Sequence, residues 1–451
     1  MPGLLVENGY LLTGNASDVE IPVGYILIEN DLITCVSGGK APKEIRSQAD
    51  EIIDASGQIV MPGLINAHVH LQQSLVRGLA DDREVWDWVQ NVAFPIYSEM
   101  SNEEVYLATM VGMIENIRSG ATATTDNQTV RSRAGNFEAA FRAAKESGIR
   151  YKLARGFNNH GVPEQFIETT EGIIEDMSGL YETWHGQENG RLRLDFNPHT
   201  LYLVTEETML RVNEKAHEWG IGVHLHTAES QDELNMFAED TGMNHVEWLA
   251  DRELLGPHFQ LAHSVWLSEN EINSIAESGA VPVHNPVCNM FCGSGVSPVP
   301  QMLEAGIPVA MGTDGQACNN GQEMMDTLKW TINVHKLNSR DANIISPEQV
   351  IQMATRNGAH AFGQPDLIGS LEPGKKADLI IVDLNDPRLT TPTLNLSSLI
   401  VNFARKEDVV TTIVDGTVLM RDRKILFLDE DVLMEEFKQA RAGLLKRTGI
   451  L

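Results

Sequence analysis

The clearest chemical feature of the sequence is a pair of histidines, His68 and His70, that follows the largely apolar run 58–67. Side chains two residues apart point to the same side of an extended strand, so both imidazoles would face one point. Neutral imidazole is the commonest metal ligand in proteins. A chance structural pair is the alternative for this motif alone, and further ligand candidates must decide between the two.

Three later segments supply such candidates: His224 and His226 followed by Glu229, then His263, then Asp314. Each follows an apolar run that reads as a buried strand. Three imidazoles and a carboxylate suit zinc or iron and leave a position open for water. The alternatives for single residues are a buried core histidine for His263, a helix cap for Asp314 and a first-turn helix residue for Glu229.

Strand-like and helical patterns alternate between residues 58 and 340, which predicts an α/β fold, a parallel (β/α)8 TIM barrel. The strand candidates are 58–67, 121–126, 151–156, 192–197, 221–227, 259–263, 280–284 and 307–313. The helical patterns include 102–118, 136–147, 206–219, 231–238, 243–250, 268–277, 298–305 and 322–336. In such a barrel the residues at the carboxyl ends of the strands line the active site, so the ligand candidates are expected to converge.

Both ends of the chain are rich in strand-like segments, at 4–12, 23–36, 376–383 and 409–416. We therefore expect a flanking β-sandwich built from both termini. The predicted domains are a composite β-sandwich from 1–59 and 370–428, a catalytic barrel at 60–369, and a C-terminal helix at 429–451.

The charge and cysteine content narrow the possible partners and location. Lys plus Arg is 34 and Asp plus Glu is 63, and the net charge of −29 argues against nucleic acid and membrane surfaces as partners. No signal peptide is expected, and no apolar run approaches the ~18 residues of a membrane helix. Four cysteines without a Cys-x-x-Cys pair favour a reduced, cytoplasmic protein. Cys288 and Cys292 are expected to be small buried residues, with a metal pair as the alternative.

Together these features resemble the amidohydrolase superfamily, in the branch of metal-dependent deaminases and chlorohydrolases that act on nitrogen heterocycles. The resemblance spans nearly the whole chain. The motifs that carry it are 62–70, His226 to Glu229, His263, His284-Asn285-Pro286, Gly293-Ser294-Gly295, Gly312-Thr313-Asp314 and 369–379.

The resemblance implies that His68, His70, His226 and Asp314 bind a single divalent metal, zinc in the first place and iron as the alternative. Glu229, His263 and Asp314 would be the catalytic residues, which shuttle protons and stabilise the developing oxyanion. His224 competes with His226 for the ligand role, because both face the same way. No lysine is placed to bridge two metals. Relatives often form dimers, so a homodimer is expected.

The resemblance also suggests substrate-binding residues: Gln73, Trp88, His199, Cys318 and Asn319. An aromatic wall of Trp86 and Trp88 would stack on a flat ring, and packing onto the barrel is the alternative. The segments around Gln73 and Cys318 look like the melamine deaminase and atrazine chlorohydrolase group, although glycine at 315 departs from it.

Pro198-His199 looks instead like adenosine-type and purine-type deaminases. The predicted function is therefore a metal-dependent aminohydrolase that replaces an amino group on a planar nitrogen heterocycle (triazine, pyrimidine, purine or pterin) with hydroxyl and releases ammonia. One alternative is hydrolysis of a carbon–chlorine, alkylamine or cyclic amide bond at the same metal site. The other alternative is a non-catalytic binding protein on the same scaffold.

Overall fold

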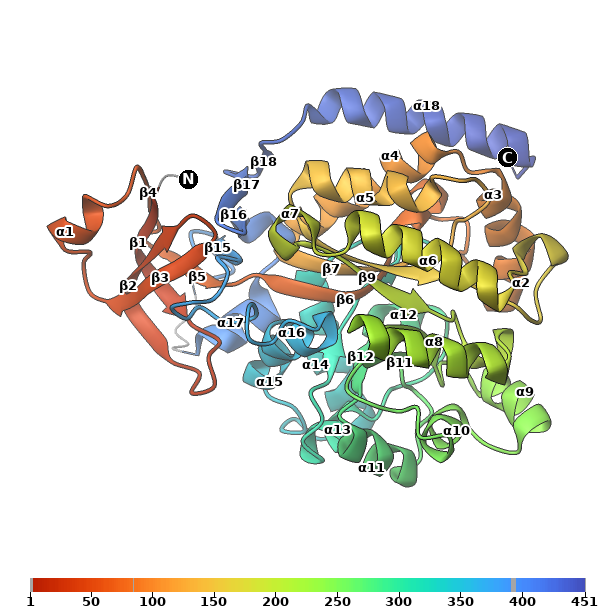
Figure 1. The fold of residues 1–451 in the computed structure, drawn as a ribbon. Helices are drawn as coiled ribbons and strands as arrows, with labels where there is room; N and C mark the ends of the chain where they lie inside the picture. The colour runs from red at the N-terminus through yellow and green to blue at the C-terminus, as the bar shows by residue number, and fades with distance from the viewer. Residues whose placement is uncertain (1–2, 84, 391–394, 451) are drawn as a thin grey trace.

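The computed structural model describes residues 3–83, 85–390 and 395–450, without the side chains of residues 85 and 86. This part of the chain forms a barrel of parallel strands surrounded by helices, with a second sheet at one end (Figure 1). Among the described helices, none has the length and apolar content that crossing a membrane requires.

The barrel strands pair in parallel in the order of the sequence, which confirms the predicted TIM barrel. They are β6 (Leu64–His70), β7 (Ala121–Gln128), β8 (Arg150–Gly156), β9 (Leu192–Asn197), β10 (Val223–Thr227), β11 (Phe259–His263) and β12 (Val281–His284). The eighth strand comes in two pieces, because β13 (Ala310–Met311) pairs with β12 while β14 (Asp314–Gly315) pairs with β6. The ring is therefore closed by two short segments on either side of Gly312-Thr313.

Helices cover the outside of this ring. In the barrel they are α2 (Val85–Trp88), α3 (Phe94–Glu99), α4 (Asn102–Arg118), α5 (Asn136–Ser147), α6 (Thr170–Trp184), α7 (Gln187–Gly190), α8 (Glu206–Trp219), α9 (Gln231–Thr241), α10 (His245–Asp251), α11 (Glu269–Ser278), α12 (Pro286–Phe291), α13 (Val299–Glu304), α14 (Met324–Ser339), α15 (Pro347–Ala354) and α16 (Arg356–Phe362). Two later helices are α17 (Leu396–Phe403) and α18 (Glu430–Thr448), and α18 lies over α3 and α4 (Figure 1).

The second sheet, here called the terminal sheet, joins strands from both ends of the chain in the order β18-β17-β16-β15-β5-β1-β2-β3, with β4 on β1. This confirms the predicted flanking β unit built from both termini. Its strands are β1 (Gly3–Leu12), β2 (Glu20–Glu29), β3 (Leu32–Gly38), β4 (Glu51–Asp54), β5 (Gln58–Pro62), β15 (Leu379–Asp383), β16 (Val409–Val414), β17 (Thr417–Arg421) and β18 (Lys424–Ile425).

The predicted strand 58–67 is divided between the two sheets at Gly63. Residues before it form β5 in the terminal sheet, and residues after it form β6 in the barrel. A Cβ at Gly63 would lie 2.1 Å from the side chain of Thr122, so a larger residue would push β6 away from β7. The chain thus passes directly from one sheet into the strand that carries His68 and His70.

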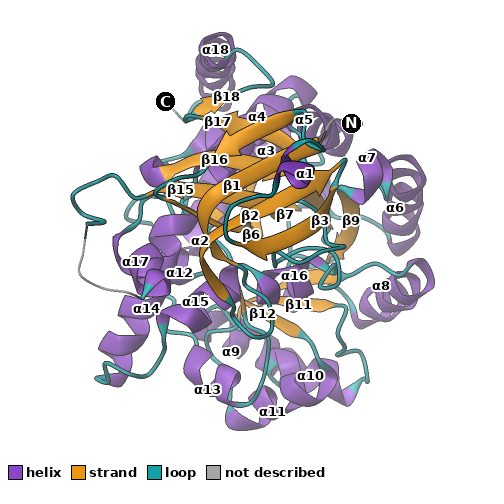
Figure 2. Ribbon diagram, turned by 90° about the vertical axis from the view of Figure 1, so that its left-hand side faces the viewer, coloured by secondary structure: helices purple, strands orange, loops and turns teal. Residues whose placement is uncertain are grey.

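A buried ion cluster joins the terminal sheet to the barrel. Arg150, at the start of β8, is fully buried and donates to Asp378 over 2.7 and 3.0 Å and to Asp415 over 3.0 Å. The terminal sheet therefore lies at the amino ends of the barrel strands, as the view from its side shows (Figure 2). The carboxyl ends of the strands, where barrel enzymes place their active sites, remain open.

Candidate active site

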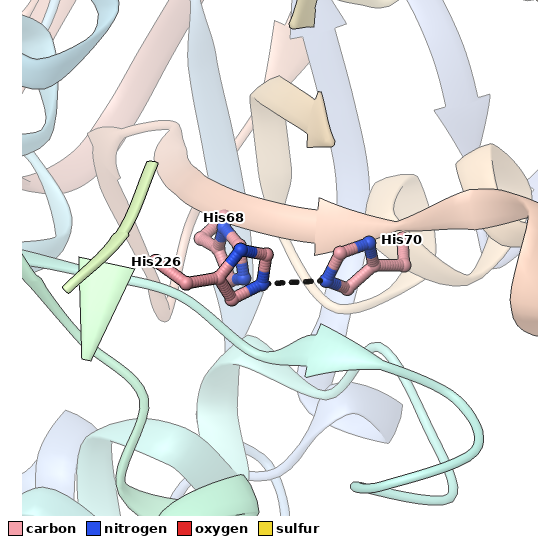
Figure 3. A group of neighbouring side chains, drawn as sticks. All are labelled: His68, His70 and His226. Atoms are coloured by element: carbon pink, nitrogen blue, oxygen red, sulfur yellow. Dashed lines mark hydrogen bonds between the residues drawn. The ribbon is translucent and has the colours of Figure 1, made fainter. Parts of the chain in front are cut away.

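Four of the predicted metal ligands meet at the carboxyl end of the barrel. Nε2 of His68 and Nε2 of His70, both from β6, lie 3.4 and 3.2 Å from Oδ1 of Asp314. Nε2 of His226, from β10, lies 3.3 Å from Nε2 of His70. Figure 3 shows the three imidazoles turned toward one another. The structure therefore brings together side chains that are up to 246 residues apart in the sequence (68 to 314).

The hydrogen bonds around these rings fit a metal. Nδ1 of His70 lies 2.8 Å from the carbonyl oxygen of Asn127, and Nδ1 of His226 lies 2.8 Å from that of His199. A carbonyl only accepts, so each Nδ1 carries the proton and each Nε2 keeps a lone pair. Two lone pairs 3.3 Å apart repel each other unless a cation lies between them. The Nε2 atoms of His68, His70 and His226 and the carboxylate of Asp314 are a donor set for a divalent metal with an open position.

His224, the competing ligand candidate, lies behind His68. Its Nε2 is 2.7 Å from Nδ1 of His68, and both rings are completely buried. Burial lowers the pKa of His224 well below its usual range, so the ring is neutral. Its Nε2 can then accept the Nδ1–H of His68, which leaves Nε2 of His68 free to face Asp314. The geometry therefore favours His226 as the ligand and His224 as a positioning residue.

Glu229 and His263 lie beside this group. Nε2 of His263 is 3.7 Å from Oε2 of Glu229 and 3.7 Å from Oδ2 of Asp314. Its Nδ1 bonds to Oδ1 of Asn289 over 2.9 Å. Burial raises the pKa of Glu229, so this carboxyl holds its proton to a higher pH than usual. Burial opposes protonation of His263, but the carboxylates of Glu229 and Asp314 outweigh it and raise the pKa of the ring.

Four residues of the site have left-handed backbone conformations. The φ angles are 50° at Ala228, 71° at His263, 64° at Asp314 and 32° at His199. Each such residue costs about 1–3 kcal/mol, and strain of this kind concentrates where function fixes a side chain. Oδ1 of Asp314 also accepts the backbone N–H of Gly315 over 2.8 Å, which fixes the carboxylate.

A cavity opens in front of the ligand group, and four of the five predicted substrate-binding residues line it: Gln73, Trp88, His199 and Cys318. The structure places Asn319 differently, since its Nδ2 donates to the carbonyl of Thr313 and it does not belong to the described lining. The side chain of Trp86 lies outside the described residues.

Residues that sequence reasoning did not select also shape the cavity. Its wall includes aromatic and charged side chains from helices and loops far apart in the chain: Phe94, Tyr97, Arg131, Phe166, Tyr202 and Glu233. No short motif marks them, because their proximity arises only from the barrel.

Two buried polar residues support the site from behind. Asn66 donates to Oγ1 of Thr313 over 2.8 Å and accepts the Thr313 N–H over 3.0 Å, which ties β6 to the loop before Asp314. Asp126 accepts the N–H of Leu71 over 2.9 Å and the hydroxyl of Tyr151 over 2.8 Å. Burial raises the pKa of Asp126 to about 6.

Comparisons with known proteins agree with this geometry. Residues 59–419 match the model of the Amidohydrolase family. The chain is 36% identical over 448 residues to a 5'-deoxyadenosine deaminase of Methanosarcina mazei, covering 99% of each chain. It is 35% identical over 442 residues to a 5-methylthioadenosine/S-adenosylhomocysteine deaminase of Syntrophomonas wolfei, covering 98% of this chain and 99% of the relative.

Solved structures show the same fold. An adenosine deaminase from Xanthomonas campestris with bound zinc has a TM-score of 0.91 and 26% identity, covering 98% of both chains. A zinc complex of atrazine chlorohydrolase from Arthrobacter aurescens has a TM-score of 0.90 at 22% identity, covering 97% of this chain and 100% of the other. The resemblance drawn from the sequence motifs is therefore confirmed, and the chain belongs to the amidohydrolase family.

Proposed function

We propose that this chain is a mononuclear metal-dependent aminohydrolase whose substrates are adenosine nucleosides modified at the 5' position. One observation carries the proposal. The Nε2 atoms of His68, His70 and His226 meet the carboxylate of Asp314, and His70, His226 and Asp314 line one cavity with two groups that can move protons, Glu229 and His263.

The substrate class is supported by the relatives and by the cavity wall. Relatives at 33–36% identity that cover at least 94% of this chain are named as deaminases of 5'-deoxyadenosine or of 5-methylthioadenosine and S-adenosylhomocysteine. The triazine enzymes are only 21–22% identical. Trp88, Phe94 and Phe166 give the cavity flat apolar surfaces suited to a purine ring.

The two oxygens of Asp314 face different partners, which suggests two tasks. Oδ1 faces His68 and His70, so it belongs with the metal ligands. Oδ2 faces His263, and Asp314 lines the cavity, so this oxygen is suited to accept a proton from the attacking water. A divalent ion held by this set would supply a Lewis acid that lowers the pKa of water to about 7.

Glu229 supplies the second proton path. Because burial raises its pKa, the carboxyl can give a proton to the ring nitrogen next to the reacting carbon. His263 then stabilises the oxygen that gains negative charge as water adds to that carbon. The bond between carbon and oxygen forms, the proton held by Asp314 passes to the amino group, and ammonia leaves as the carbon–nitrogen bond breaks. The hydroxyl proton of the addition product returns to Glu229, which leaves a carbonyl on the ring and restores both carboxyl groups.

The test is a substrate panel read for both ammonia and chloride. It contains 5'-deoxyadenosine, 5-methylthioadenosine, S-adenosylhomocysteine, adenosine, melamine and atrazine. We expect ammonia from the 5'-modified adenosines and little from melamine. Chloride from atrazine without ammonia from any nucleoside would contradict the proposal and favour the chlorohydrolase alternative.

Metal analysis of the purified protein tests the cofactor. We propose one divalent ion per chain, with zinc favoured by three imidazole donors and by the zinc-bound structural neighbours. One iron per chain would change the identity of the metal and leave the proposed single-ion site unchanged. A folded protein that takes up neither metal would favour a binding protein. The cytoplasmic location and the homodimer stay predictions; the four free cysteines support the first.

A further inference from the structure

Three of the four cysteines gather at the wall of the active-site cavity. Cys288 and Cys292 belong to α12 and its carboxyl end, and Cys318 follows β14. All three line the cavity. Sγ of Cys288, Sγ of Cys318 and a carboxylate oxygen of Asp314 all lie within 4.8 Å of one another. The fourth cysteine, Cys35, lies in β3 of the terminal sheet and serves as a matched control.

The sulfur spacing fits a metal. Sγ of Cys288 and Sγ of Cys292 are 3.8 Å apart, far longer than the ~2.05 Å of a disulfide. Two sulfurs bound to one tetrahedral ion are separated by about 3.8 Å at the ~2.3 Å of a zinc–sulfur bond, and by a few tenths of an ångström more around the larger cadmium ion. The same geometry puts a bound sulfur and a bound carboxylate oxygen about 3.5 Å apart. Cys288 belongs both to the pair with Cys292 and to the group with Cys318 and Asp314, so side-chain rotations about it would bring these donors around one ion.

We propose that Cys288, Cys292 and Cys318, together with a carboxylate oxygen of Asp314, form a second metal site for a soft divalent cation such as cadmium. Thiolates select soft metals, whereas the imidazoles and carboxylate of the first site suit zinc or iron. The negative charge of the thiolates offsets the second cation, so two ions can share the Asp314 carboxylate between them.

Binding at this site releases protons. Each sulfur–hydrogen bond that breaks is replaced by a metal–sulfur bond, and the proton passes to solvent.

The second ion would inhibit the enzyme. It would draw the Asp314 carboxylate away from proton transfer, and it would occupy space near Glu229 and His263, whose donor atoms lie within 4.8 Å of Sγ of Cys288. This consequence depends on the proposed function, whereas the binding itself does not.

The test is a cadmium titration of the metal-loaded protein, followed by ultraviolet thiolate-to-cadmium absorption and by the cadmium retained after gel filtration. Imidazole and carboxylate ligands give no such absorption, so exchange at the first site does not mimic the signal. We expect one thiolate-bound cadmium per chain. The band should fall by at least a third in Cys288→Ser and in Cys318→Ser, and it should be unchanged in Cys35→Ser. No band in the wild-type protein, or an undiminished band in both variants, would overturn the site.

Alkylation of the native wild-type protein gives a measurement that needs no variant. Cys292, Cys318 and Cys35 are all partly exposed, so each can react with iodoacetamide. Cadmium should protect Cys292 and Cys318 and leave Cys35 as reactive as before. Equal alkylation of Cys318 with and without cadmium would contradict the proposal.

An assay of ammonia release distinguishes cadmium binding from the inhibition that we expect to follow it. Ammonia release should fall in parallel with the rise of the absorption band. A band without loss of activity would overturn the inhibitory role. An untreated enzyme that releases no ammonia would refute the proposed function and leave the binding result valid.

Discussion

Replacing His224 tests how the site selects its metal ligands. The Nε2 atom of this ring lies 2.7 Å from Nδ1 of His68, in a region where both rings are buried. His68 can bind a metal through Nε2 only when its proton sits on Nδ1 and finds an acceptor. His224→Phe keeps a flat ring in place and removes that acceptor. His224→Gln places an amide oxygen near the position of the lost nitrogen.

The size of the effect follows from the unpartnered donor. Without His224, the neutral ring of His68 can move its proton to Nε2, which lies 3.4 Å from Oδ1 of Asp314. A metal must then compete with that tautomer. A buried donor without a partner costs about 1–3 kcal/mol, which equals about 5- to 150-fold in an equilibrium constant. We therefore expect metal affinity to fall about 10- to 100-fold in His224→Phe, as for other groups that orient metal ligands.

Competition between the protein and a metal chelator measures this affinity, with thermal unfolding in excess chelator as the check on folding. His224→Gln should recover most of the loss. His226→Phe removes a coordinating atom, so it should cost more than about 100-fold. If His226→Phe bound metal better than His224→Phe did, the ligand assignment would be reversed, and the geometry of the site would have been misread.

Three further predictions concern proton transfer and stability. Glu229→Gln keeps the shape of the side chain and should retain metal while kcat falls about 10²- to 10⁴-fold; a near-normal kcat would remove Glu229 from the mechanism. Arg150→Met leaves the buried Asp378 carboxylate without its ion-pair partner, whereas Asp415 keeps Lys376 at 3.4 Å, and it should lower the free energy of unfolding by about 3–5 kcal/mol; denaturant unfolding of the variant with an additional Asp378→Asn change should show recovery. Asp126 has a raised pKa, so the native state holds a proton that the unfolded state has lost between pH 3.8 and about 6. At equal metal content, the free energy of unfolding of Asp126→Asn should therefore rise relative to that of the wild type by up to about 3 kcal/mol between pH 4 and pH 7. If the difference in free energy between the two proteins did not change with pH, the raised pKa would be contradicted.

Where capping residues and helix propensity agreed with the fold, the bounds of helices could be predicted closely from the sequence. The helix predicted at 102–118 has the same bounds in the structure, because Ser101 accepts the N–H of Glu104 while Glu104 bonds back to Ser101. Such a capping box can be read directly from residue types and spacing. The helix α6 was missed, since Gly172 and Gly179 lower its helix propensity.

Packing against the barrel stabilises α6 despite its two glycines. Its apolar residues Ile173, Met177 and Leu180 recur on one helical face and are buried against the barrel. Burial of this face outweighs the two glycines, and only the folded structure shows the surface that receives it.

The candidate metal ligands stood out because each follows a predicted strand, whereas the strand pattern alone left His224 and His226 open and only the family resemblance favoured His226. Both histidines project from the same face of β10, since side chains alternate along a strand. They differ in depth along the barrel axis, and that difference depends on how β10 is placed against β6. The hydrogen bond between His224 and His68 exists only once both strands are in the barrel.

Packing explains the residue types of the segment Gly312-Thr313-Asp314-Gly315. A Cβ at Gly312 would lie 2.9 Å from the backbone nitrogen of His68, so a larger residue would displace a metal ligand. Thr313 is held by Asn66, and Asp314 adopts a left-handed conformation that turns its carboxylate to the centre.

Gly315 extends this argument to specificity. A Cβ there would lie 1.8 Å from Oε1 of Gln73, so Gln73 occupies the space that a side chain at 315 would take. Gln73 lines the cavity and its Oε1 also accepts the N–H of Ala317 over 3.2 Å, which fixes the amide. The polar contact to substrate on this side of the cavity is therefore expected from Gln73. A side chain added at 315 would act on specificity by displacing that amide as much as by its own chemistry.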